Sequence, residues 1–253
     1  MTQALYTALT ALRSQQYGID TIANNLANVN TTGYQAWRVN FSDALYAQMR
    51  QIEEAEANLQ AGAGALVAAT GRSTTDGAAV QTDRNLDFMV SGNAYFTVGD
   101  GAGNTYYTRD GAFQVSQVGA TNYLTTADGY FVLDANGQPI TLPNSTGEGL
   151  AVDKAGNLSM GTTALGQLGL ATFVNPEGLS AVGGSKFAAT VASGAAAPAG
   201  EGVTVAQGAL EGSNVDMSQE MSLLLQSQRL YSMLGRSITT ADEMDATANS
   251  LVR

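Results

Sequence analysis

The stretch that decides the fold lies near the start of the chain, where residues 22–34 read IANNLANVNTTGY. It holds four asparagines between positions 24 and 30, and asparagine suits a helix interior poorly because its short amide competes for backbone hydrogen bonds. Two interpretations are open. Either a helix frays here and Gly33 caps it in a left-handed conformation, or Asn24, Asn25 and Asn28 bond to backbone across an interface and fix its register.

A narrow apolar seam leads into this stretch. Residues 2–29 contain no proline and one glycine, and Leu5, Leu12, Ile19 and Leu26 recur every seven residues. The intervening heptad positions are Leu9, Gln16 and Ala23. This spacing predicts a helix with a seam like that of a coiled coil.

The other end of the chain has the same pattern. Across residues 214–252, a first set of seam positions is seven residues apart: Met217, Leu224, Tyr231 and Ile238. A second set joins them: Met221, Leu234, Ala241, Ala248 and Leu251. Asn214 or Asp216 can cap this helix, and Glu220 lies near its positive N-terminal end.

The middle of the chain predicts short strands. Candidates span residues 86–90, 94–98, 105–108, 112–115, 121–125, 130–133, 139–142, 150–153, 157–160 and 167–174. Four hairpin-type dipeptides bound them: Asp100-Gly101, Asp110-Gly111, Asp128-Gly129 and Asn136-Gly137. This succession favours an antiparallel sandwich or open barrel. The expected fold class is α+β. Residues 1–33 and 214–253 form a paired helical assembly domain, residues 34–85 an extended transition segment, and residues 86–213 the β domain, with a surface loop near 192–202.

Composition excludes several classes of function. The net charge is -11, and only two lysines are present, so clustered positive charge for nucleic acid or an anionic membrane is missing. The chain has neither cysteine nor histidine, so thiolate nucleophiles, cysteine-ligated metal sites, the usual neutral-pH acid–base group and the commonest metal ligand are absent. The segment Asp100-Gly-Ala-Gly-Asn104 reads as a hairpin turn because Ala102 occupies a calcium-ligand position. We expect no enzyme, cofactor, metal or small-molecule substrate.

The terminal seams are too narrow to stabilise isolated helices of this length. The β domain can bring the two ends together, but a pair of such helices still exposes apolar surface, which requires neighbouring copies. No signal peptide or apolar run near the ~20 residues of a membrane span is visible. That pattern fits a cytosolic protein and a leaderless export route equally well.

Several motifs resemble one family. Residues 23–34 look like the N-terminal signature of bacterial flagellar rod and hook proteins, and residues 207–216 (QGALEGSNVD) resemble the segment that enters the family's last helix. Residues 228–231 and 240–242 resemble motifs inside that helix, and residues 86–88, 106–113 and 128–130 match in the middle, so the resemblance covers most of the chain in order. The chain length is similar to that of the distal rod type (FlgG type), and residues 41–50 resemble a segment of that type. Ala94-Tyr95-Phe96 replaces an expected Gly-Phe-Phe, which leaves the proximal type (FlgF type) as the alternative.

The resemblance implies a rod subunit that polymerises into a helical tube and transmits torque to the hook. Its implied partners are copies of itself, neighbouring rod and hook proteins and the flagellar export apparatus, and its implied place is the basal body, reached without a cleaved signal peptide. The expected assembly residues are Leu5, Leu12, Ile19, Asn24, Asn25, Leu26, Asn28, Gly33, Tyr34, Asn214, Val215, Leu224, Gln228, Arg229, Tyr231, Ile238 and Asp242.

Two other functions compete. A cell-wall glycosidase needs only a pair of carboxylates, and Asp83, Asp87 and Asp110 lie in the β region. These residues occupy turn and strand-end positions, which favours structural roles. A β-domain adhesin or capping protein with helical stalks would instead bind a partner other than itself and would not grow into filaments.

Overall fold

A computed structural model describes residues 3–45, 47–50, 59–143, 147–200 and 202–251. The chain forms two compact units. The first, here called the helical unit, comprises Met1–Ala27, Trp37–Arg72 and Asp216–Arg253. The second, the β unit, comprises Asn28–Ala36 and Ser73–Val215. The segment predicted as one transition, residues 34–85, is therefore shared between the two units, and the chain passes from one to the other four times.

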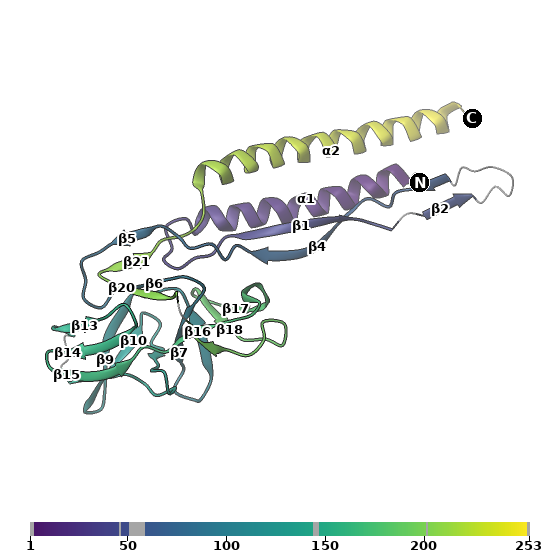
Figure 1. Cartoon of the computed structure of the whole chain (residues 1–253). Helices are drawn as coiled ribbons and strands as arrows, with labels where there is room; N and C mark the ends of the chain where they lie inside the picture. The colour runs from purple at the N-terminus through teal and green to yellow at the C-terminus, as the bar shows by residue number, and fades with distance from the viewer. Residues whose placement is uncertain (1–2, 46, 51–58, 144–146, 201, 252–253) are drawn as a thin grey trace. The chain divides into compact units, whose positions relative to one another are not determined.

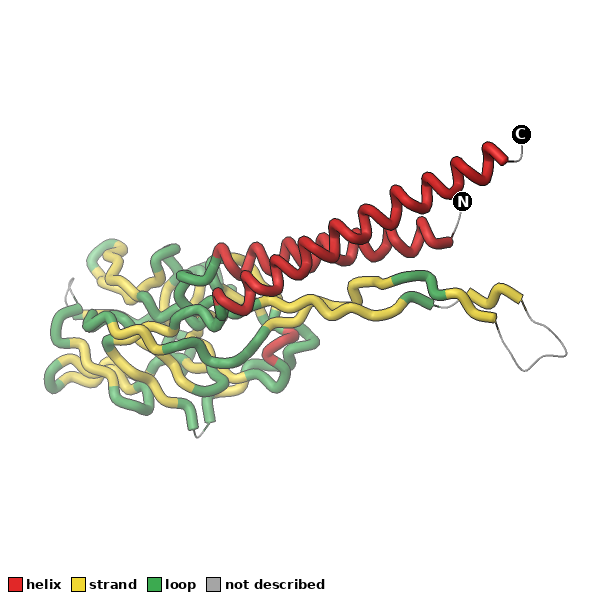
Figure 2. Tube along the Cα trace, turned by 90° about the horizontal axis from the view of Figure 1, so that it is seen from above, coloured by secondary structure: helices red, strands yellow, loops and turns green. Residues whose placement is uncertain are grey.

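In its described residues, the helical unit contains two long helices and four strands. α1 (Gln3–Ala27) and α2 (Met217–Leu251) lie side by side and run in opposite directions (Figures 1 and 2). β1 (Trp37–Asp43) and β4 (Ala65–Arg72) form an antiparallel pair that packs against α1. β2 (Ala47–Arg50) pairs antiparallel with β3 (Leu59–Ala61). Among the described residues, no helix is long and apolar enough to span a membrane.

The β1–β4 pair lies in the segment that the sequence analysis expected to be an extended transition, without predicting any strand pairing there. Strand β4 includes the first three residues of the stretch 70–77, whose small and polar composition predicts an extended or flexible segment. β1 is exposed along most of its length and β4 along half of its length, so their sequences lack the alternation of apolar and polar residues that marks a half-buried strand. A bulge between Asn40 and Phe41 further breaks the period.

The β unit is built on one large antiparallel sheet. Its main path runs in the order β12-β10-β11-β7-β8-β18-β17, with β9 beside β10, β16 beside β7 and β19 beside β16. These strands are β7 (Tyr95–Gly99), β8 (Thr105–Thr108), β9 (Phe113–Val118), β10 (Thr121–Thr126), β11 (Phe131–Val132), β12 (Thr141–Leu142), β16 (Leu170–Thr172), β17 (Ser180–Gly183), β18 (Lys186–Ala188) and β19 (Ala197–Pro198). The α+β class and the largely antiparallel β domain are thus confirmed.

Three smaller antiparallel sheets also lie in the described part of the β unit. They are β13 (Leu150–Val152), β14 (Asn157–Met160) and β15 (Thr163–Gln167) in one, β6 (Phe88–Ser91) with β20 (Thr204–Gln207) in another, and β5 (Ala79–Gln81) with β21 (Ala209–Glu211) in the third. A 3₁₀ helix, η1, spans Pro176–Gly178. The predicted strand 167–174 is split, because β15 ends at Gln167 and β16 begins at Leu170.

Two apolar clusters form the core of the β unit. The larger contains the fully buried rings of Phe88, Phe96 and Phe113, and Phe113 packs edge-on against Phe96 with ring centroids 5.3 Å apart. The smaller cluster gathers four aromatic residues, Tyr95, Tyr107, Phe173 and Phe187, around Ala171 and Leu179. Strand β7 joins the two clusters, because its consecutive residues Tyr95 and Phe96 point to opposite faces of the sheet.

Three of the four predicted turn dipeptides lie between strands or bridges that pair with each other, at positions 100–101, 128–129 and 136–137. Asp110-Gly111 also separates two strands, but β8 and β9 do not pair with each other. A Cβ atom on Gly111 would collide with the carbonyl group of Phe88. Gly111 therefore serves close backbone approach and not a hairpin turn.

Candidate assembly surfaces

The most buried face of α1 is small and polar. Among its described side chains, Ser14 and Asn25 are buried together with Gly18. The Ser14 hydroxyl donates to the Ala65 carbonyl oxygen at 2.9 Å, and a Cβ atom on Gly18 would lie 3.4 Å from the Phe41 ring. This face therefore seats α1 on the β1–β4 pair through close approach and hydrogen bonds to backbone.

Asn25 makes the most specific of these contacts. Its Nδ2 donates to the Trp37 carbonyl oxygen at 2.8 Å, and its Oδ1 accepts from the Trp37 backbone N–H at 2.9 Å. The side-chain amide thus pairs with the first residue of β1 as a neighbouring strand would. Nδ2 also donates to Glu220 Oε1 at 3.3 Å, so one residue of α1 contacts both the sheet and the first turn of α2.

The remaining asparagines of the opening stretch behave differently. Asn24 is exposed, and Asn28 lies beyond the end of α1, where its Oδ1 accepts from the Thr31 hydroxyl at 3.2 Å. Gly33 has the left-handed φ of 64°, but it follows the helix end at Ala27 by several residues and does not cap it. Of the expected amide-to-backbone contacts, the structure shows that of Asn25, and it lies within one chain. Asn28 instead takes part in a local turn.

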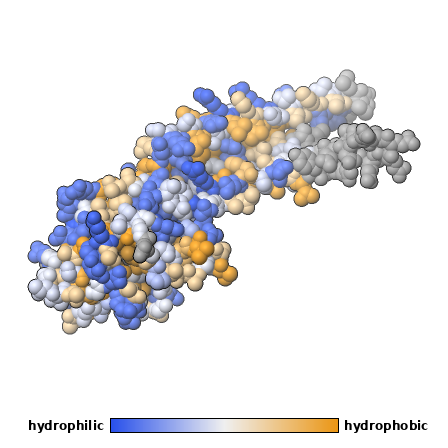
Figure 3. All heavy atoms as spheres, viewed as in Figure 1, coloured by the Kyte–Doolittle hydropathy of each residue, from blue (hydrophilic) through white to orange (hydrophobic). Residues whose placement is uncertain are grey.

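Helix α2 has no buried side chain among its described residues. Its half-buried positions Leu224, Leu234, Ile238 and Ala241 follow the predicted seam, on the helix that lies beside α1. Tyr231, Gln228, Arg229 and Asp242 are exposed. Exposed large apolar residues are Met217, Met221, Leu223, Leu225, Leu230, Met233 and Met244, and apolar side chains are visible over this unit as orange spheres in Figure 3.

The predicted seam of α1 is also only partly covered. Leu5, Leu12, Ile19 and Leu26 are half-buried, whereas Leu9, Gln16 and Ala23 are exposed. One side of the heptad seam thus faces into the unit and the other side faces solvent. Both helices of the helical unit consequently leave uncovered apolar surface, of the kind that marks interaction sites.

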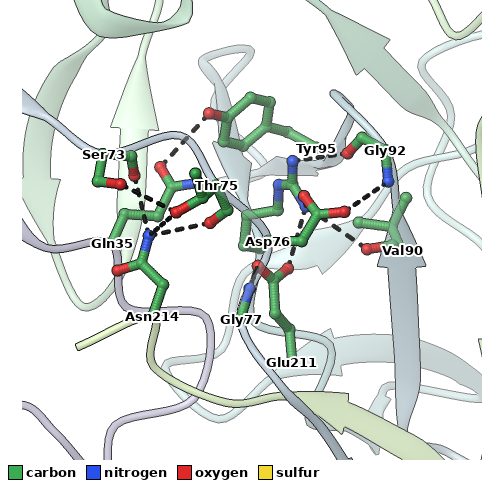
Figure 4. Close-up of polar contacts among 11 residues, drawn as sticks. Gln35, Ser73, Thr75, Asp76, Gly77, Val90, Gly92, Tyr95, Glu211 and Asn214 are labelled. Atoms are coloured by element: carbon green, nitrogen blue, oxygen red, sulfur yellow. Dashed lines mark hydrogen bonds and ion pairs between the residues drawn. The ribbon is translucent and has the colours of Figure 1, made fainter. Parts of the chain in front are cut away.

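The β unit holds a polar junction at which its separate chain segments meet (Figure 4). Asn214 Oδ1 accepts from the Ala36 N–H at 2.7 Å. Its Nδ2 donates to the carbonyl oxygens of Ser73 and Thr75 at 3.1 and 2.9 Å, and its backbone N–H donates to the Tyr34 carbonyl oxygen at 3.3 Å. Asn214 therefore ties three passages of the chain together.

The cap of α2 is Asp216 and not Asn214, which settles the choice that the sequence left open. Asp216 Oδ1 accepts from the backbone N–H groups of Ser218 and Gln219 at 2.9 and 3.2 Å, the usual geometry of an N-cap. Val215, also expected at the assembly surface, is half-buried beside Asn214. Asp216 therefore caps α2, whereas Asn214 connects chain segments within the β unit.

A buried arginine forms the centre of the junction. Arg109 is fully buried, and its Nη1 donates to Glu211 Oε2 at 3.1 Å and to Asp76 Oδ1 at 3.2 Å. Nη2 donates to the Gly92 carbonyl oxygen at 2.7 Å, and the guanidinium lies 5.0 Å from the centroid of the Tyr95 ring. Burial raises the pKa of Glu211, and the nearby Arg109 charge partly opposes this shift.

Tyr95 also explains a departure from the family pattern. It occupies the middle of Ala94-Tyr95-Phe96, where Gly-Phe-Phe is expected. Its hydroxyl donates to Oε1 of the buried Gln35 at 3.4 Å, a contact that phenylalanine lacks. The ring keeps the packing role of a phenylalanine in the smaller aromatic cluster.

Thr32 and Gly33, near the end of the opening stretch, pack against the segment that contains Arg109 and Asp110. Gly33 N–H donates to the Glu211 carbonyl oxygen at 2.8 Å, and a Cβ atom at Gly33 would lie 2.5 Å from the Asp110 nitrogen. The Thr32 hydroxyl donates to Asp110 Oδ1 at 2.8 Å. Burial raises the pKa of Asp110, against the hydrogen bond from Thr32. Glycine is therefore required at position 33 by both conformation and space.

Sequence reasoning missed Arg109 as a functional residue, although its motif was recognised. The sequence offers one signal for it: Arg109 is one of only 11 basic residues and directly follows the predicted strand 105–108. A buried arginine requires acidic partners, so this position could have been singled out. The partners Asp76 and Glu211 lie 33 and 102 residues away. No local pattern could identify them.

The carboxylates considered for hydrolysis have structural partners. Asp87 is buried and pairs with Arg84 at 3.4 Å, Asp83 adopts a left-handed φ of 56° beside β5, and Asp110 accepts from Thr32. A groove of about 770 Å³ in the β unit is lined mainly by small and apolar residues, with Asp134 as its carboxylate. Asp134 Oδ1 accepts from the backbone N–H groups of Asn136 and Gln138. In the described part of the chain, no group of three or more acidic residues could hold a metal ion.

Comparison with known proteins gives matches along the whole chain. Residues 5–35 match the family model "Flagella basal body rod protein", residues 89–160 match "Flagellar hook protein FlgE/F/G D1 domain", and residues 206–251 match "Flagellar basal body rod FlgEFG protein C-terminal". The second match covers much of the β unit, and the other two cover the terminal helices.

Full-length relatives agree with these models. The flagellar basal-body rod protein FlgG of Borreliella burgdorferi is 37% identical, with all of both chains covered. The FlgG of Agrobacterium fabrum is 37% identical over 96% of each chain. The flagellar hook-basal body complex protein FlhP of Bacillus subtilis is 35% identical over 99% of this chain and 100% of its own. The chain therefore belongs to the flagellar basal-body rod proteins of the FlgG type, a family of structural proteins and not of enzymes.

Proposed function

We propose that this chain polymerises into a helical tube, the distal part of the basal-body rod, and transmits torque from there to the hook. The observation that carries the proposal is the incomplete burial of both terminal helices. α1 and α2 lie beside each other, yet each keeps exposed apolar residues along its length. Such surface is stabilised when further copies cover it.

The two helices would act as a coiled-coil pair in the assembled tube. The half-buried positions of α2 alternate in steps of three and four residues at Glu220, Leu224 and Ser227, and again at Leu234, Ile238 and Ala241. This is the spacing of a heptad seam. The expected assembly residues Leu5, Leu12, Ile19 and Leu26 on α1 would supply the facing seam.

The other expected assembly residues divide by exposure. Asn24, Gln228, Arg229, Tyr231 and Asp242 are exposed on the helices, and we propose that they contact neighbouring subunits. Asn25, Gly33, Tyr34, Asn214 and Val215 are buried or half-buried within the chain. Their proposed role is indirect, since they hold the segments that lead into and out of the helices.

The proposed partners are copies of the chain, the adjoining rod and hook proteins, and the flagellar export apparatus, which would deliver the chain without a cleaved signal peptide. Flagellar names among the relatives support the first two partners. A net charge of -11 argues against nucleic acid as a partner.

Electron microscopy of the concentrated full-length chain tests this proposal. The unsubstituted chain should grow into filaments, alone or on fragments of a related rod added as seeds. Leu224→Glu should abolish growth, because it places a charge on the seam. Ser232→Glu, an exposed position on α2 outside the seam, is the matched control and should still assemble. A monomer that never grows, even when seeded, would contradict the proposal.

A further inference from the structure

Half of the methionines in this chain lie on one helix and are exposed there. The sequence has eight methionines and no cysteine, so thioether sulfur is the only sulfur that the chain offers to an oxidant. Four of the eight, here called the α2 methionines, are Met217, Met221, Met233 and Met244, and they are 43%, 47%, 62% and 65% exposed. Oxidation of a sulfur follows its exposure to solvent, so all four are accessible in the free chain.

The two methionines of the β unit are less accessible. Met89 in β6 is 7% exposed. Met160 at the end of β14 is half-buried and packs against the larger apolar cluster. Both carry the same thioether in the same molecule. They therefore serve as internal references, because an oxidant should reach them more slowly than it reaches the α2 methionines.

The α2 methionines form two pairs on different faces of the helix. Met217 and Met221 are four residues apart, and Met233 and Met244 are eleven residues apart. At about 100° of rotation per residue, each pair therefore projects along one face. On the same scale, the half-buried Leu224 lies between the two faces. Methionine sulfur thus flanks the predicted seam of α2 on both sides.

Oxidation of methionine by hydrogen peroxide is a two-electron step. A lone pair of the sulfur attacks one peroxide oxygen, and the S–O bond forms as the O–O bond breaks. The hydroxide that leaves takes up the proton of the transferred oxygen and becomes water. The product is methionine sulfoxide, which is polar where methionine is apolar. Methionine sulfoxide reductases reverse the change, since the oxygen leaves as water while two thiols are oxidised to a disulfide.

We propose that the α2 methionines are a reversible oxidation site that decides whether a free chain can join the assembly. The proposal rests on the proposed function and adds regulation to it. In the free chain, water satisfies a sulfoxide oxygen at each of these exposed positions, so the fold tolerates oxidation. A neighbouring chain that covers α2 removes this water, and a buried acceptor without a donor opposes the contact. Oxidation therefore acts on chains that have not yet assembled.

Peroxide treatment of the full-length chain tests the proposal, with mass spectrometry of its peptides and electron microscopy of seeded growth as measurements. We expect sulfoxide at the α2 methionines before Met89 and Met160. Filament growth should fall by about tenfold and should recover after treatment with reductases for both sulfoxide epimers. The thermal unfolding of the treated free chain should match that of the untreated chain. A lower unfolding midpoint would overturn the proposal, because damage to the fold would then explain the lost growth.

A variant that cannot be oxidised in α2 is the matched control. Met217→Leu, Met221→Leu, Met233→Leu and Met244→Leu, made together, keep apolar side chains of similar volume and leave Met89 and Met160 in place. This variant should grow equally well with and without peroxide. If treatment stops its growth as it stops that of the native chain, the damage lies elsewhere and the proposal is wrong.

The native chain separates this proposal from the proposed function. A native chain that carries sulfoxide at the α2 methionines and still grows at the untreated rate would overturn the oxidation site and leave the proposed function standing. An untreated native chain that never grows, even when seeded, would overturn both.

Discussion

Arg109 and Glu211 form a buried ion pair that closes the β unit, with Nη1 and Oε2 3.1 Å apart and neither side chain open to solvent. Glu211 ends β21, the last strand before the chain leaves the unit, and Asp76, the second anion on Arg109, follows the point where the chain re-enters it. The arginine thus connects the incoming and outgoing segments at one point.

Removal of this arginine should destabilise the β unit strongly. Arg109→Met keeps much of the side-chain volume but leaves Glu211 as an uncompensated buried charge, and breaking a buried pair costs about 3–5 kcal/mol. Urea unfolding of the full chain at neutral pH measures this loss. The double variant Arg109→Met/Glu211→Leu should recover most of it, because both charges are gone. A loss below about 1 kcal/mol for the single variant would contradict the assignment.

The same pair predicts a pH dependence. Burial raises the pKa of Glu211 above its ordinary value of 4.5, so the folded chain holds this proton more tightly than the unfolded chain does. The resulting stabilisation is complete below the unfolded pKa and is lost as the pH rises through the folded pKa. The free energy of unfolding of the native chain, minus that of Glu211→Gln, should therefore decrease from about pH 4.5 upward. Urea titrations at several pH values check it, and a difference that grows with pH would refute the direction.

Gly33 gives a prediction with an internal control. Gly33→Ala adds strain at a φ of 64° and brings Cβ to 2.5 Å from the Asp110 nitrogen. Gly119 has nearly the same φ, 66°, with no neighbour within 4 Å of such a Cβ. Gly119→Ala should cost about 1–2 kcal/mol from conformation alone. Gly33→Ala should cost clearly more in the same unfolding assay, because backbone must move as well. Equal costs would mean that the close approach to Asp110 does not matter.

The parts of this fold that the sequence predicted are those with a repeating apolar signal. Heptad spacing located both helices, and turn dipeptides with aromatic and β-branched runs located most strands up to β14. The sequence indicated Asn25 as a residue that bonds to backbone, but it did not predict the β1–β4 pair or the roles of Ser14 and Gly18, because these small and polar positions create no apolar period. Their contacts are hydrogen bonds and close approach, which depend on residues that are distant in sequence. The Arg109 cluster escaped for the same reason.

Asn25 offers the sharpest test of the face that the heptad pattern does not reveal. Asn25→Asp keeps the shape of the side chain but removes the donor to the Trp37 carbonyl oxygen and adds a negative charge beside Glu220. Glu220 already has a raised pKa, chiefly from burial and against the hydrogen bond from Asn25. A buried group left without its partner costs about 1–3 kcal/mol, and more when it is charged. Hydrogen exchange at the Trp37 amide should accelerate by at least tenfold, because its acceptor then belongs to a loosened helix.

The matched control is Gln16→Glu, which makes the same amide-to-carboxylate change at an exposed position of α1. In the monomer it should leave both the Trp37 exchange rate and the unfolding free energy unchanged. The two substitutions lie on opposite sides of one helix, so a difference between them isolates the contact with β1 from any general effect of charge on α1. If Asn25→Asp and Gln16→Glu behave alike, Asn25 does not hold the helix on the sheet, and the register of α1 must come from its apolar seam alone.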